Sequence, residues 1–435
     1  MEDGSIPKSD DIVGRGHRRI IVCCDGTWND RETQDPFTNV STFVGCLAHI
    51  DNRFGKLYHQ IPVYLDGIGT GNTAVGKRYY GATGIGIERK IREAYKNICT
   101  LHMDYNDEII LVGFSRGAYT IQCLARLIND VGLIEASCVD EELPGVFKLW
   151  INTTGRSDNG ELQKKCRELM AAPAYQTTED PVVQQKKRLR KPADGIKINM
   201  FAAWDNVSAL KSTGFLGRSK KPFAFVGDQL PPNVQVAYHA LALDERRSNF
   251  SPVLLSKAHP RQTLKQCWFL GSHGDVGGSV EASGLANIPL CWMMQQLDYG
   301  VKFENWAAWS RTNSRGPTLQ RDTRWNSQLR SAAVQITGAK KSDSFTGWWK
   351  FLGASPRKVG KSKDPEDETI HFSVRWFRDI AVPEKKRDSE ALKTFEHSKG
   401  PPFEWKGKTD GQTVTISEWE GNHREEALVQ TWMVL

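Results

Sequence analysis

The sequence of 435 residues lacks any long hydrophobic run. No stretch approaches the ~18 consecutive apolar residues that a transmembrane helix needs, so the sequence predicts no membrane span. The polar leader, residues 1–17, also lacks the apolar segment of a secretory signal peptide. These absences favour a cytoplasmic protein whose contact with membranes, where it occurs, is peripheral.

Paired cysteines are absent too. The nine cysteines form an odd set without a C-x-x-C pair, the spacing typical of zinc and redox sites. Cys23 and Cys24 are adjacent within an apolar run, which indicates buried free thiols rather than a disulfide framework. No group of histidines, cysteines and acids has metal-ligand spacing, so we expect neither a metal nor another cofactor.

The chain carries little excess charge. Charged residues make up 25% of the sequence and the formal net charge is +7, which is too weak to predict nucleic-acid binding and favours at most an anionic lipid surface. One dense basic run, Lys186–Lys191, is compatible with a nuclear localisation signal, a lipid-binding patch or a solvated surface.

Short apolar runs alternate with helical patterns along the first 300 residues. Strands are predicted at residues 19–24, 63–65, 108–112, 196–201 and 266–270, and helices at residues 86–103, 118–128 and 285–297. Such alternation is typical of an α/β fold with a mostly parallel central sheet and helices on both faces.

The composition changes at several points, which suggests a division of the chain. We expect a catalytic domain over residues 18–300, interrupted by an insertion or lid at 155–193, and a C-terminal extension over 301–435 that packs on the core. The insertion is polar and contains three prolines. Within the extension, Trp348–Leu352 suits a core or a membrane interface, and His371–Phe377 has a strand pattern.

The segment Gly113-Phe114-Ser115-Arg116-Gly117 matches the pattern G-x-S-x-G. It lies where a predicted strand meets a predicted helix, which is the position of the nucleophile elbow in α/β-hydrolases. In that turn the flanking glycines allow close approach of neighbouring chain, and the serine hydroxyl stands above the sheet edge. We therefore predict an α/β-hydrolase-like fold with Ser115 as the nucleophile.

A serine nucleophile needs a base and an orienting acid, in the chain order Ser, Asp, His for this fold. His273 follows a predicted strand in a glycine-rich loop, and it is the favoured base over His239, which lies in an apolar stretch. Asp205 ends another predicted strand and is the favoured acid, with Asp244 in reserve. Both choices follow the rule that α/β enzymes place chemistry at strand carboxyl ends.

The oxyanion of such a reaction needs backbone donors. The Arg116 N–H at the start of the helix is one expected donor, and the Gly26 or Thr27 N–H after the first strand is the other. Asp25 and Asp275 are expected to brace the two loops that carry these groups and the base.

A second glycine-rich loop, Gly71–Lys77, matches most of a Walker A motif. Arg78 occupies the next position, where a Ser or Thr would hold magnesium, so nucleotide binding is the weaker interpretation.

Five ordered blocks together resemble the DUF2235 proteins, which include the Tle1-like phospholipase effectors of bacterial type VI secretion. The matching blocks are Cys24–Asn29, Gly113–Ala118, Trp204–Val207, His239–Glu245 and His273–Gly278, with a weaker match at Gly284–Ile288. The resemblance covers roughly residues 18–297. It implies an α/β-hydrolase core, a triad of Ser115, Asp205 and His273, and phospholipase A activity on glycerophospholipids.

One block departs from the family pattern. It reads Ala-Ala-Trp-Asp-Asn-Val at residues 202–207 rather than the commoner Gly-Val-Trp-Asp-Thr-Val. The acid is kept, although packing around it differs. Nothing in the chain resembles a secretion-effector tail, so a toxin role is not implied.

The sequence therefore predicts a serine hydrolase that cleaves carboxylic esters, with a phospholipid or related lipid as the substrate. The competing hypothesis is a catalytically silent adaptor of the same fold that binds a membrane or a protein. A third, a nucleotide-binding protein, depends on the Walker-like loop alone.

Overall fold

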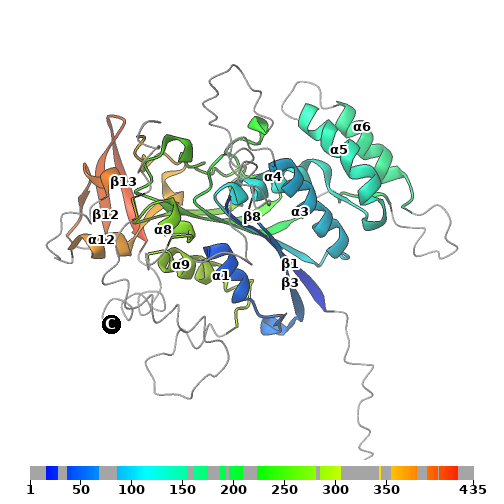
Figure 1. Cartoon of the computed structure of the whole chain (residues 1–435), viewed down its shortest axis with the longest axis horizontal. Helices are drawn as coiled ribbons and strands as arrows, with labels where there is room; N and C mark the ends of the chain where they lie inside the picture. Colours follow the sequence, from blue (N-terminus) through cyan, green and yellow to red (C-terminus); the bar gives the residue numbers. More distant parts are fainter. Residues whose placement is uncertain are drawn as a thin grey trace, which may run out of the picture.

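A large, mostly parallel sheet forms the centre of the computed structural model (Figure 1). The structure describes residues 16–27, 37–67, 86–153, 160–174, 187–192, 195–208, 223–280, 285–304, 342–343, 354–379, 389–399 and 401–419. The strands of this sheet are β1 (His17–Cys24), β2 (Ile50–Asp51), β3 (Tyr58–Leu65), β4 (Glu108–Phe114), β7 (Ile198–Trp204), β8 (Val234–Ala242), β9 (Thr263–Phe269), β10 (Glu368–His371), β11 (Glu396–His397), β12 (Glu404–Thr409) and β13 (Gln412–Trp419).

The order of strands across the sheet is β11-β12-β13-β10-β9-β8-β7-β4-β1-β3-β2. Every pairing from β3 through β13 is parallel, and the antiparallel pairings lie at the two edges. The parallel strands β1, β4, β7, β8 and β9 therefore all end on the same side of the sheet. This carboxyl end of the strands is where open α/β sheets bind their ligands.

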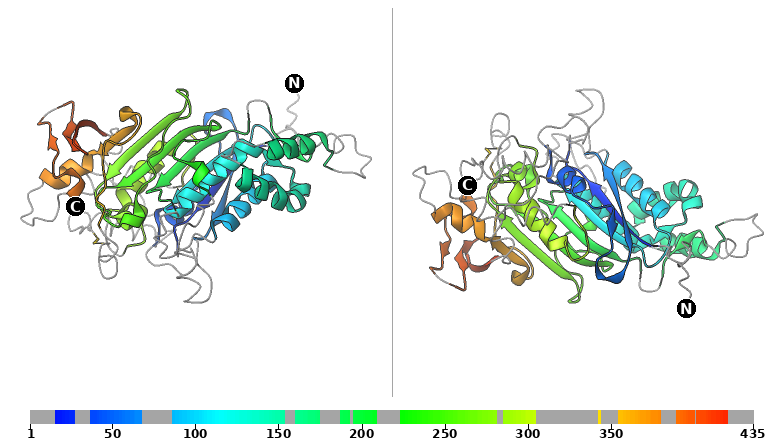
Figure 2. Two further views of the ribbon diagram at one scale, coloured as in Figure 1. Left: turned by 90° about the horizontal axis from the view of Figure 1, so that it is seen from above. Right: turned by 90° about the horizontal axis from the view of Figure 1, so that it is seen from below.

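Helices cover both faces of the sheet, as Figure 2 shows from opposite sides. One face carries α1 (Asn39–Gly45), α9 (Asn287–Leu297) and α12 (Phe372–Asp379). The other carries α3 (Ile87–Leu101), α4 (Arg116–Val131), α5 (Val139–Thr153) and α6 (Gly160–Ala171), with a small second sheet of β5 (Leu133–Ile134) and β6 (Leu189–Arg190). The predicted fold class is confirmed.

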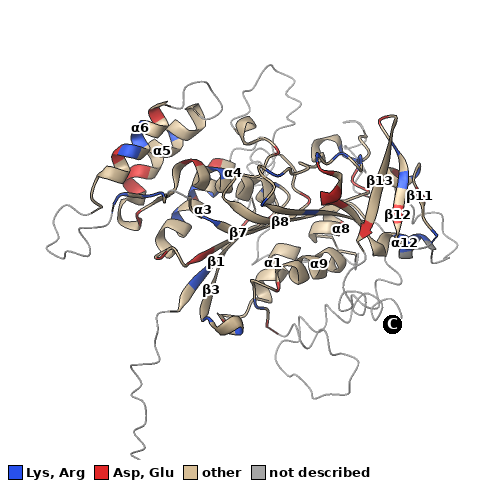
Figure 3. Cartoon of the chain, turned by 180° about the vertical axis from the view of Figure 1, so that it is seen from behind, with Lys and Arg blue, Asp and Glu red and all other residues tan. Residues whose placement is uncertain are grey.

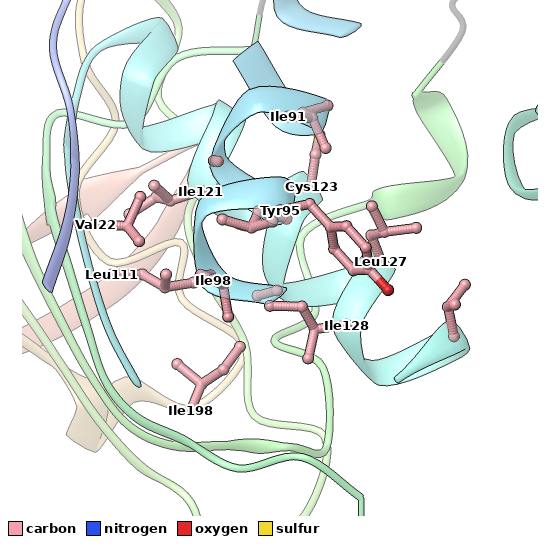
Figure 4. Packing of buried hydrophobic residues seen from close by; sticks show 14 of the residues in the cluster. Val22, Ile91, Tyr95, Ile98, Leu111, Ile121, Cys123, Leu127, Ile128 and Ile198 are labelled. Atoms are coloured by element: carbon pink, nitrogen blue, oxygen red, sulfur yellow. The ribbon is translucent and has the colours of Figure 1, made fainter. Parts of the chain in front are cut away.

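Strand periodicity explains why both faces are covered. Ile21 and Cys23 of β1 pack toward α1 and α9, whereas Ile20 and Val22 pack toward α3 and α4, and all four are fully buried. Figure 4 shows the second cluster, in which Tyr95 lies among aliphatic side chains of helices and strands. Strands that are buried on both faces have continuous apolar sequences, and these apolar runs are the pattern from which the strands were predicted.

Each strand and helix predicted in the first 300 residues is confirmed, with ends that differ by a few residues. The sequence did not predict β8, α5 or α6. The last of these lies within the polar stretch 155–193, where three apolar residues, Leu162, Cys166 and Leu169, are buried. Its expected role as an insertion or lid stays a prediction.

The strand predicted over His371–Phe377 is wrong. Strand β10 ends at His371, and Phe372–Asp379 forms the helix α12. A short apolar run does not distinguish a strand from a helix by periodicity alone. The turn into the helix is held by a hydrogen bond between His371 Nδ1 and the Ser373 hydroxyl at 2.8 Å.

The C-terminal part of the chain continues the main sheet rather than standing apart from it. Strand β10 pairs with β9, and Ile370, Trp405 and Ile416 are buried in the same apolar cluster as α9. The expected domain boundary at residue 300 stays a prediction.

All nine cysteines are buried free thiols. No helix in the described part of the chain is long and apolar enough to cross a bilayer.

Candidate active site

Ser115 occupies a sharp turn between β4 and α4. Its backbone has φ 57° and ψ −126°, in the positive-φ region that non-glycine residues rarely adopt. The turn is possible because two neighbours are glycines. A Cβ on Gly113 would lie 2.7 Å from the Ala118 nitrogen, and one on Gly117 would overlap the carbonyl oxygens of Cys24 and Asp25. This strained geometry, which costs roughly 1–3 kcal/mol, is typical of functional residues.

Three predicted residues come together around this turn. The Ser115 hydroxyl lies 2.8 Å from His273 Nε2, and His273 Nδ1 lies 2.6 Å from Asp205 Oδ2. Because a carboxylate can only accept, the imidazole carries its proton on Nδ1, and Nε2 is left to accept from the serine. The serine and histidine are 158 positions apart in the chain.

His273 begins the short helix α8 (His273–Gly277) just after β9. A capping box fixes the start of this helix, with Ser272 as the N-cap and the Asp275 carboxylate accepting from the Ser272 N–H at 2.8 Å. Asp275 also accepts from the Ser342 hydroxyl at 2.9 Å. The Phe114 and Phe250 rings pack on the imidazole, with centroids 4.7 and 5.0 Å away.

Asp205 follows β7 with φ 40° and is fully buried. Its Oδ1 accepts from the Ala242 N–H at 3.1 Å. Both carboxylate oxygens also accept from Arg357, whose Nη1 and Nη2 lie 3.2 Å from Oδ1 and 2.8 Å from Oδ2. Burial alone would raise the pKa of Asp205, but Arg357 and His273 hold it well below its usual range. The carboxyl group is therefore ionised.

Burial raises the pKa of an acid but lowers the pKa of a base such as His273. His273 is 6% exposed, and burial lowers its pKa below the usual 6.5 although the contacts with Asp205 oppose this change. A neutral imidazole is the form that can accept a proton from a serine.

Asp25 braces the loop after β1. Its carboxylate accepts from the Thr38 hydroxyl, the Tyr64 hydroxyl and the Gly26 N–H, each at 2.6 Å. Burial raises the pKa of Asp25 to about 6 against the opposing effect of these bonds. The Gly26 N–H is thus engaged with Asp25, which leaves Thr27 as the better candidate of the two predicted backbone donors in this loop.

The second predicted donor, the Arg116 N–H, belongs to the first residue of α4. The first N–H groups of a helix point along its axis and carry the positive end of the helix dipole. They therefore suit an anion that forms at Ser115.

The reserve candidates have other partners. His239 is fully buried, accepts from the Asn206 N–H at 3.0 Å through Nε2, and lies 3.2 Å from Gln266 through Nδ1. Burial lowers its pKa to about 4. Asp244 accepts from the Gly271 N–H at 2.8 Å. Each supports a loop that carries a residue of the Ser115–His273–Asp205 chain.

Sequence reasoning missed two contacts at this site. Arg357 comes from a stretch rich in charge and glycine, and no motif marks it. Glu245 accepts from the His273 N–H at 3.3 Å and pairs with Arg247, whose Nη2 lies 2.8 Å away. Glu245 ends one of the blocks that resemble the family, so that block was the available signal.

The basic run, for which the sequence left open a localisation signal, a lipid-binding patch or a solvated surface, has structural partners where it is described. Arg188 pairs with Glu142 at 2.7 Å, Arg190 pairs with Glu135 at 3.4 Å, and the Lys191 ammonium donates to the Asp130 carbonyl. Charged residues of both signs lie on the adjacent α5 and α6 (Figure 3). These contacts favour a structural role for the run.

Several predicted features lie outside the described residues: Trp28 and Asn29, the Walker-like loop Gly71–Lys77, Lys186, and the aromatic cluster Trp348–Leu352. Among the residues that are described, no group of histidines, cysteines and acids has the arrangement of a metal site.

Comparison with known proteins gives a relative in yeast. The uncharacterized protein YEL023C of Saccharomyces cerevisiae is 26% identical over 272 residues, which cover 58% of this chain and 36% of that protein. The chain thus spans about a third of the length of this relative.

Two solved structures also match at low identity. One is the Tle1 effector bound to the VgrG spike of the type 6 secretion system, with 16% identity over 61% of this chain and 52% of that chain and a TM-score of 0.30. The other is an uncharacterized protein from Pseudomonas aeruginosa, with 13% identity over 65% of this chain and 45% of that chain and a TM-score of 0.34.

One protein family matches the greater part of the chain. It is described as the type VI secretion system phospholipase effector Tle1-like catalytic domain, and it matches residues 18–296. That range contains Ser115, Asp205 and His273. The protein belongs to the Tle1-like phospholipase effector family.

Proposed function

We propose that this protein is a serine hydrolase that cleaves carboxylic ester bonds through an acyl-enzyme. The observation that carries the proposal is the continuous chain of contacts from the Ser115 hydroxyl through His273 to Asp205, at 2.8 and 2.6 Å. A nucleophile, a base and an orienter in hydrogen-bond contact are the signature of nucleophilic catalysis.

His273 takes the proton of Ser115 as the serine oxygen attacks the ester carbonyl. Asp205 holds the imidazole in the Nδ1–H tautomer and stabilises the imidazolium. His273 then gives the proton to the leaving alcohol, and the acyl group remains on the serine. Water, deprotonated by the same histidine, releases the acid and restores the enzyme.

Backbone N–H groups stabilise the oxyanion of each tetrahedral intermediate. We assign one donor to Arg116, at the first turn of α4, and the other to Thr27 in the loop braced by Asp25. Gly117 brings these two segments together, because its missing side chain lets the helix lie against the Cys24 and Asp25 carbonyls. Such a donor is worth roughly 2.7–4 kcal/mol of transition-state stabilisation.

We propose a phospholipid or a related acylglycerol-like lipid as the substrate class, with phospholipase A-like cleavage of an acyl ester. Membership of a phospholipase effector family supports this choice. The mild positive charge, +7, is compatible with an anionic lipid surface.

A fluorophosphonate probe tests the chemistry, since it labels only an activated serine. Ser137 is an exposed serine between β5 and α5 and serves as the control. We expect the wild-type protein and Ser137→Ala to be labelled, and Ser115→Ala to be unlabelled with an unchanged melting temperature. Hydrolysis of defined phospholipids by purified protein should fall by about 10⁶-fold in Ser115→Ala. Absence of labelling and of hydrolysis in the folded wild type would contradict the proposal and favour the silent adaptor.

A further inference from the structure

The acid of the candidate triad is paired with an arginine that comes from outside the family's matched region. Arg357 is 5% exposed and places its guanidinium on both oxygens of Asp205, at 3.2 and 2.8 Å. The family match ends at residue 296. A charged group brought into a protein interior needs a compensating partner, and Asp205 is the partner here.

The segment around Arg357 is fixed on both sides of that residue. Before it, the Ser355 N–H donates to the Arg246 carbonyl at 2.7 Å, and Ala354 forms a bridge with Arg247. After it, Val359 is fully buried in the core, and the Ser362 hydroxyl accepts from Gln266 at 3.1 Å. The guanidinium is therefore positioned by the fold rather than by a flexible side chain reaching inward.

A second carboxylate that contacts His273 is also paired with an arginine. Glu245 accepts from the His273 N–H, and Arg247 forms a two-pronged pair with that carboxylate, at 2.9 and 2.8 Å. His273 thus contacts two carboxylates, Asp205 through the imidazole and Glu245 through the backbone N–H, and each carboxylate has its own arginine. Two further ionisable groups of the described residues lie near this arrangement: His239, which is buried and interacts with Asp205, and Asp275, which faces Ser272 and Ser342.

This arrangement has two physical effects on the reaction. A bidentate guanidinium fixes the plane of the Asp205 carboxylate, so that Oδ2 points at His273 Nδ1. It also offsets the negative charge that would otherwise attract a proton to the imidazole. Because the guanidinium offsets the charge of the ionised Asp205, the histidine remains free to accept the serine proton at a lower pH.

We propose that Arg357 is a positioning residue of the hydrolytic site: it holds Asp205 ionised and oriented, and it keeps His273 neutral into the acid range. The C-terminal segment thereby completes a site whose other members lie within residues 18–296. This inference rests on the proposed hydrolase function.

The test compares Arg357→Met and Arg357→Lys with the wild type and with Arg375→Met. Arg375 is a matched control, since it pairs with Glu418 at 2.9 Å in the same C-terminal region and does not touch the triad. The measurement is the pH profile of kcat/KM for a soluble carboxylic ester, together with the melting temperature of each variant.

We expect the acid limb of Arg357→Met to move up by about one pH unit or more, because an unpaired Asp205 draws a proton to the pair. The acid limb of the pH profile moves upward whether Asp205 or His273 takes that proton. The plateau rate should fall by about 10- to 100-fold through lost orientation. Arg357→Lys should recover most of the pH shift but not the plateau rate, because an ammonium lacks the planar fork.

A second readout does not depend on activity. In a Ser115→Ala background, the NMR titration of the His273 imidazole should move upward with Arg357→Met and remain unchanged with Arg375→Met. If the protein neither reacts with fluorophosphonate nor hydrolyses esters, the proposed function fails, while this titration still reports on Arg357.

A folded Arg357→Met protein with the wild-type acid limb and titration would overturn the inference, as would an equal shift in Arg375→Met. Should Arg357→Met fail to fold, Arg357→Lys decides the matter. A folded Arg357→Lys variant with the wild-type plateau rate would show that the two-pronged contact of the guanidinium with Asp205 is not needed. That result would contradict the positioning role of Arg357.

Discussion

Two buried aspartates lie at the same carboxyl end of the sheet but differ in the direction in which their pKa values are shifted. Asp25 follows β1 and Asp205 follows β7, so they flank β4, the strand that leads into Ser115. Asp25 is 2% exposed and Asp205 is 0% exposed. Yet burial raises the pKa of the first to about 6, whereas the pKa of the second lies well below its usual range.

The partners of each carboxylate explain the difference. Asp25 accepts from two hydroxyls and one backbone N–H, all of which are neutral. Asp205 accepts from the guanidinium of Arg357 and from His273 as well as from a backbone N–H. At Asp25 the neutral donors offset only part of the desolvation, whereas at Asp205 a cation in direct contact helps to outweigh it. The difference fits the proposed roles, in which Asp25 braces a loop and Asp205 orients the base.

Among the substitutions that separate the two aspartates, Asp205→Asn should have the largest effect on the rate. An amide would donate to His273 Nδ1, and the imidazole would then carry its proton on Nε2 and could no longer accept from Ser115. We expect kcat for ester hydrolysis to fall on the order of 10⁴-fold. The substitution also leaves the buried Arg357 without its carboxylate, so unfolding by denaturant should show a loss of roughly 3–5 kcal/mol.

The double variant Asp205→Asn with Arg357→Met serves as the control for that prediction. It removes both charges, so we expect it to regain much of the lost stability while its rate stays low. An Asp205→Asn protein that retains the wild-type rate would refute the assignment of this acid.

Gly117→Ala should have the next largest effect, because it acts on the contact between the elbow and the Asp25 loop. The added Cβ would overlap the Cys24 and Asp25 carbonyl oxygens, and both are backbone atoms that cannot move aside cheaply. We expect a loss of about 1–3 kcal/mol in the free energy of unfolding, with weaker fluorophosphonate labelling.

Gly145→Ala provides the matched control. Gly145 lies within helix α5, and nothing lies within 4 Å of a Cβ placed there. This substitution should leave labelling unchanged and stabilise the protein by up to about 1 kcal/mol. If both variants behave alike, the close approach at Gly117 has no special role.

The placement of both aspartates beside Ser115 could be predicted from the sequence. Asp205 and Asp25 both follow apolar runs that end at strand boundaries, and Ser115 lies in a recognisable motif, so their placement at one sheet edge follows from local patterns. The proximity of Asp205 to His273 required only the rule that parallel strands end together.

Arg357 could not be predicted in the same way. It lies 152 positions from Asp205 in a polar stretch, and only the three-dimensional path of the chain brings the two together. The hydrogen bond from the Gly26 N–H to the Asp25 carboxylate could not be predicted either, because it depends on the side-chain rotamer of Asp25. The helix α12 was mistaken for a strand because its apolar run is too short for periodicity to distinguish the two.

Replacing Asp25 with Asn should have the smallest effect on the rate. Hydroxyls can accept as well as donate, so Thr38 and Tyr64 can turn to accept from the amide while its oxygen keeps the Gly26 N–H. Asp205 has no such alternative, because a guanidinium only donates. We therefore expect kcat to stay within about tenfold of the wild-type value, which is a change of about 1.4 kcal/mol or less.

The stability of Asp25→Asn should depend on pH in a way that sharpens the comparison. The pKa of Asp25 is raised from 3.8 to about 6 on folding, so its favourable contribution is complete below the unfolded value and is lost as pH rises through the folded one. The asparagine does not titrate. The unfolding free energy of the variant should therefore rise relative to that of the wild type as the pH increases from about 4 to 6. The change is about 1.4 kcal/mol for each unit of difference between the folded and unfolded pKa values. Denaturant unfolding at several pH values between about 4 and 6 measures this, and a difference that does not vary across that range would mean that folding does not raise the pKa of Asp25.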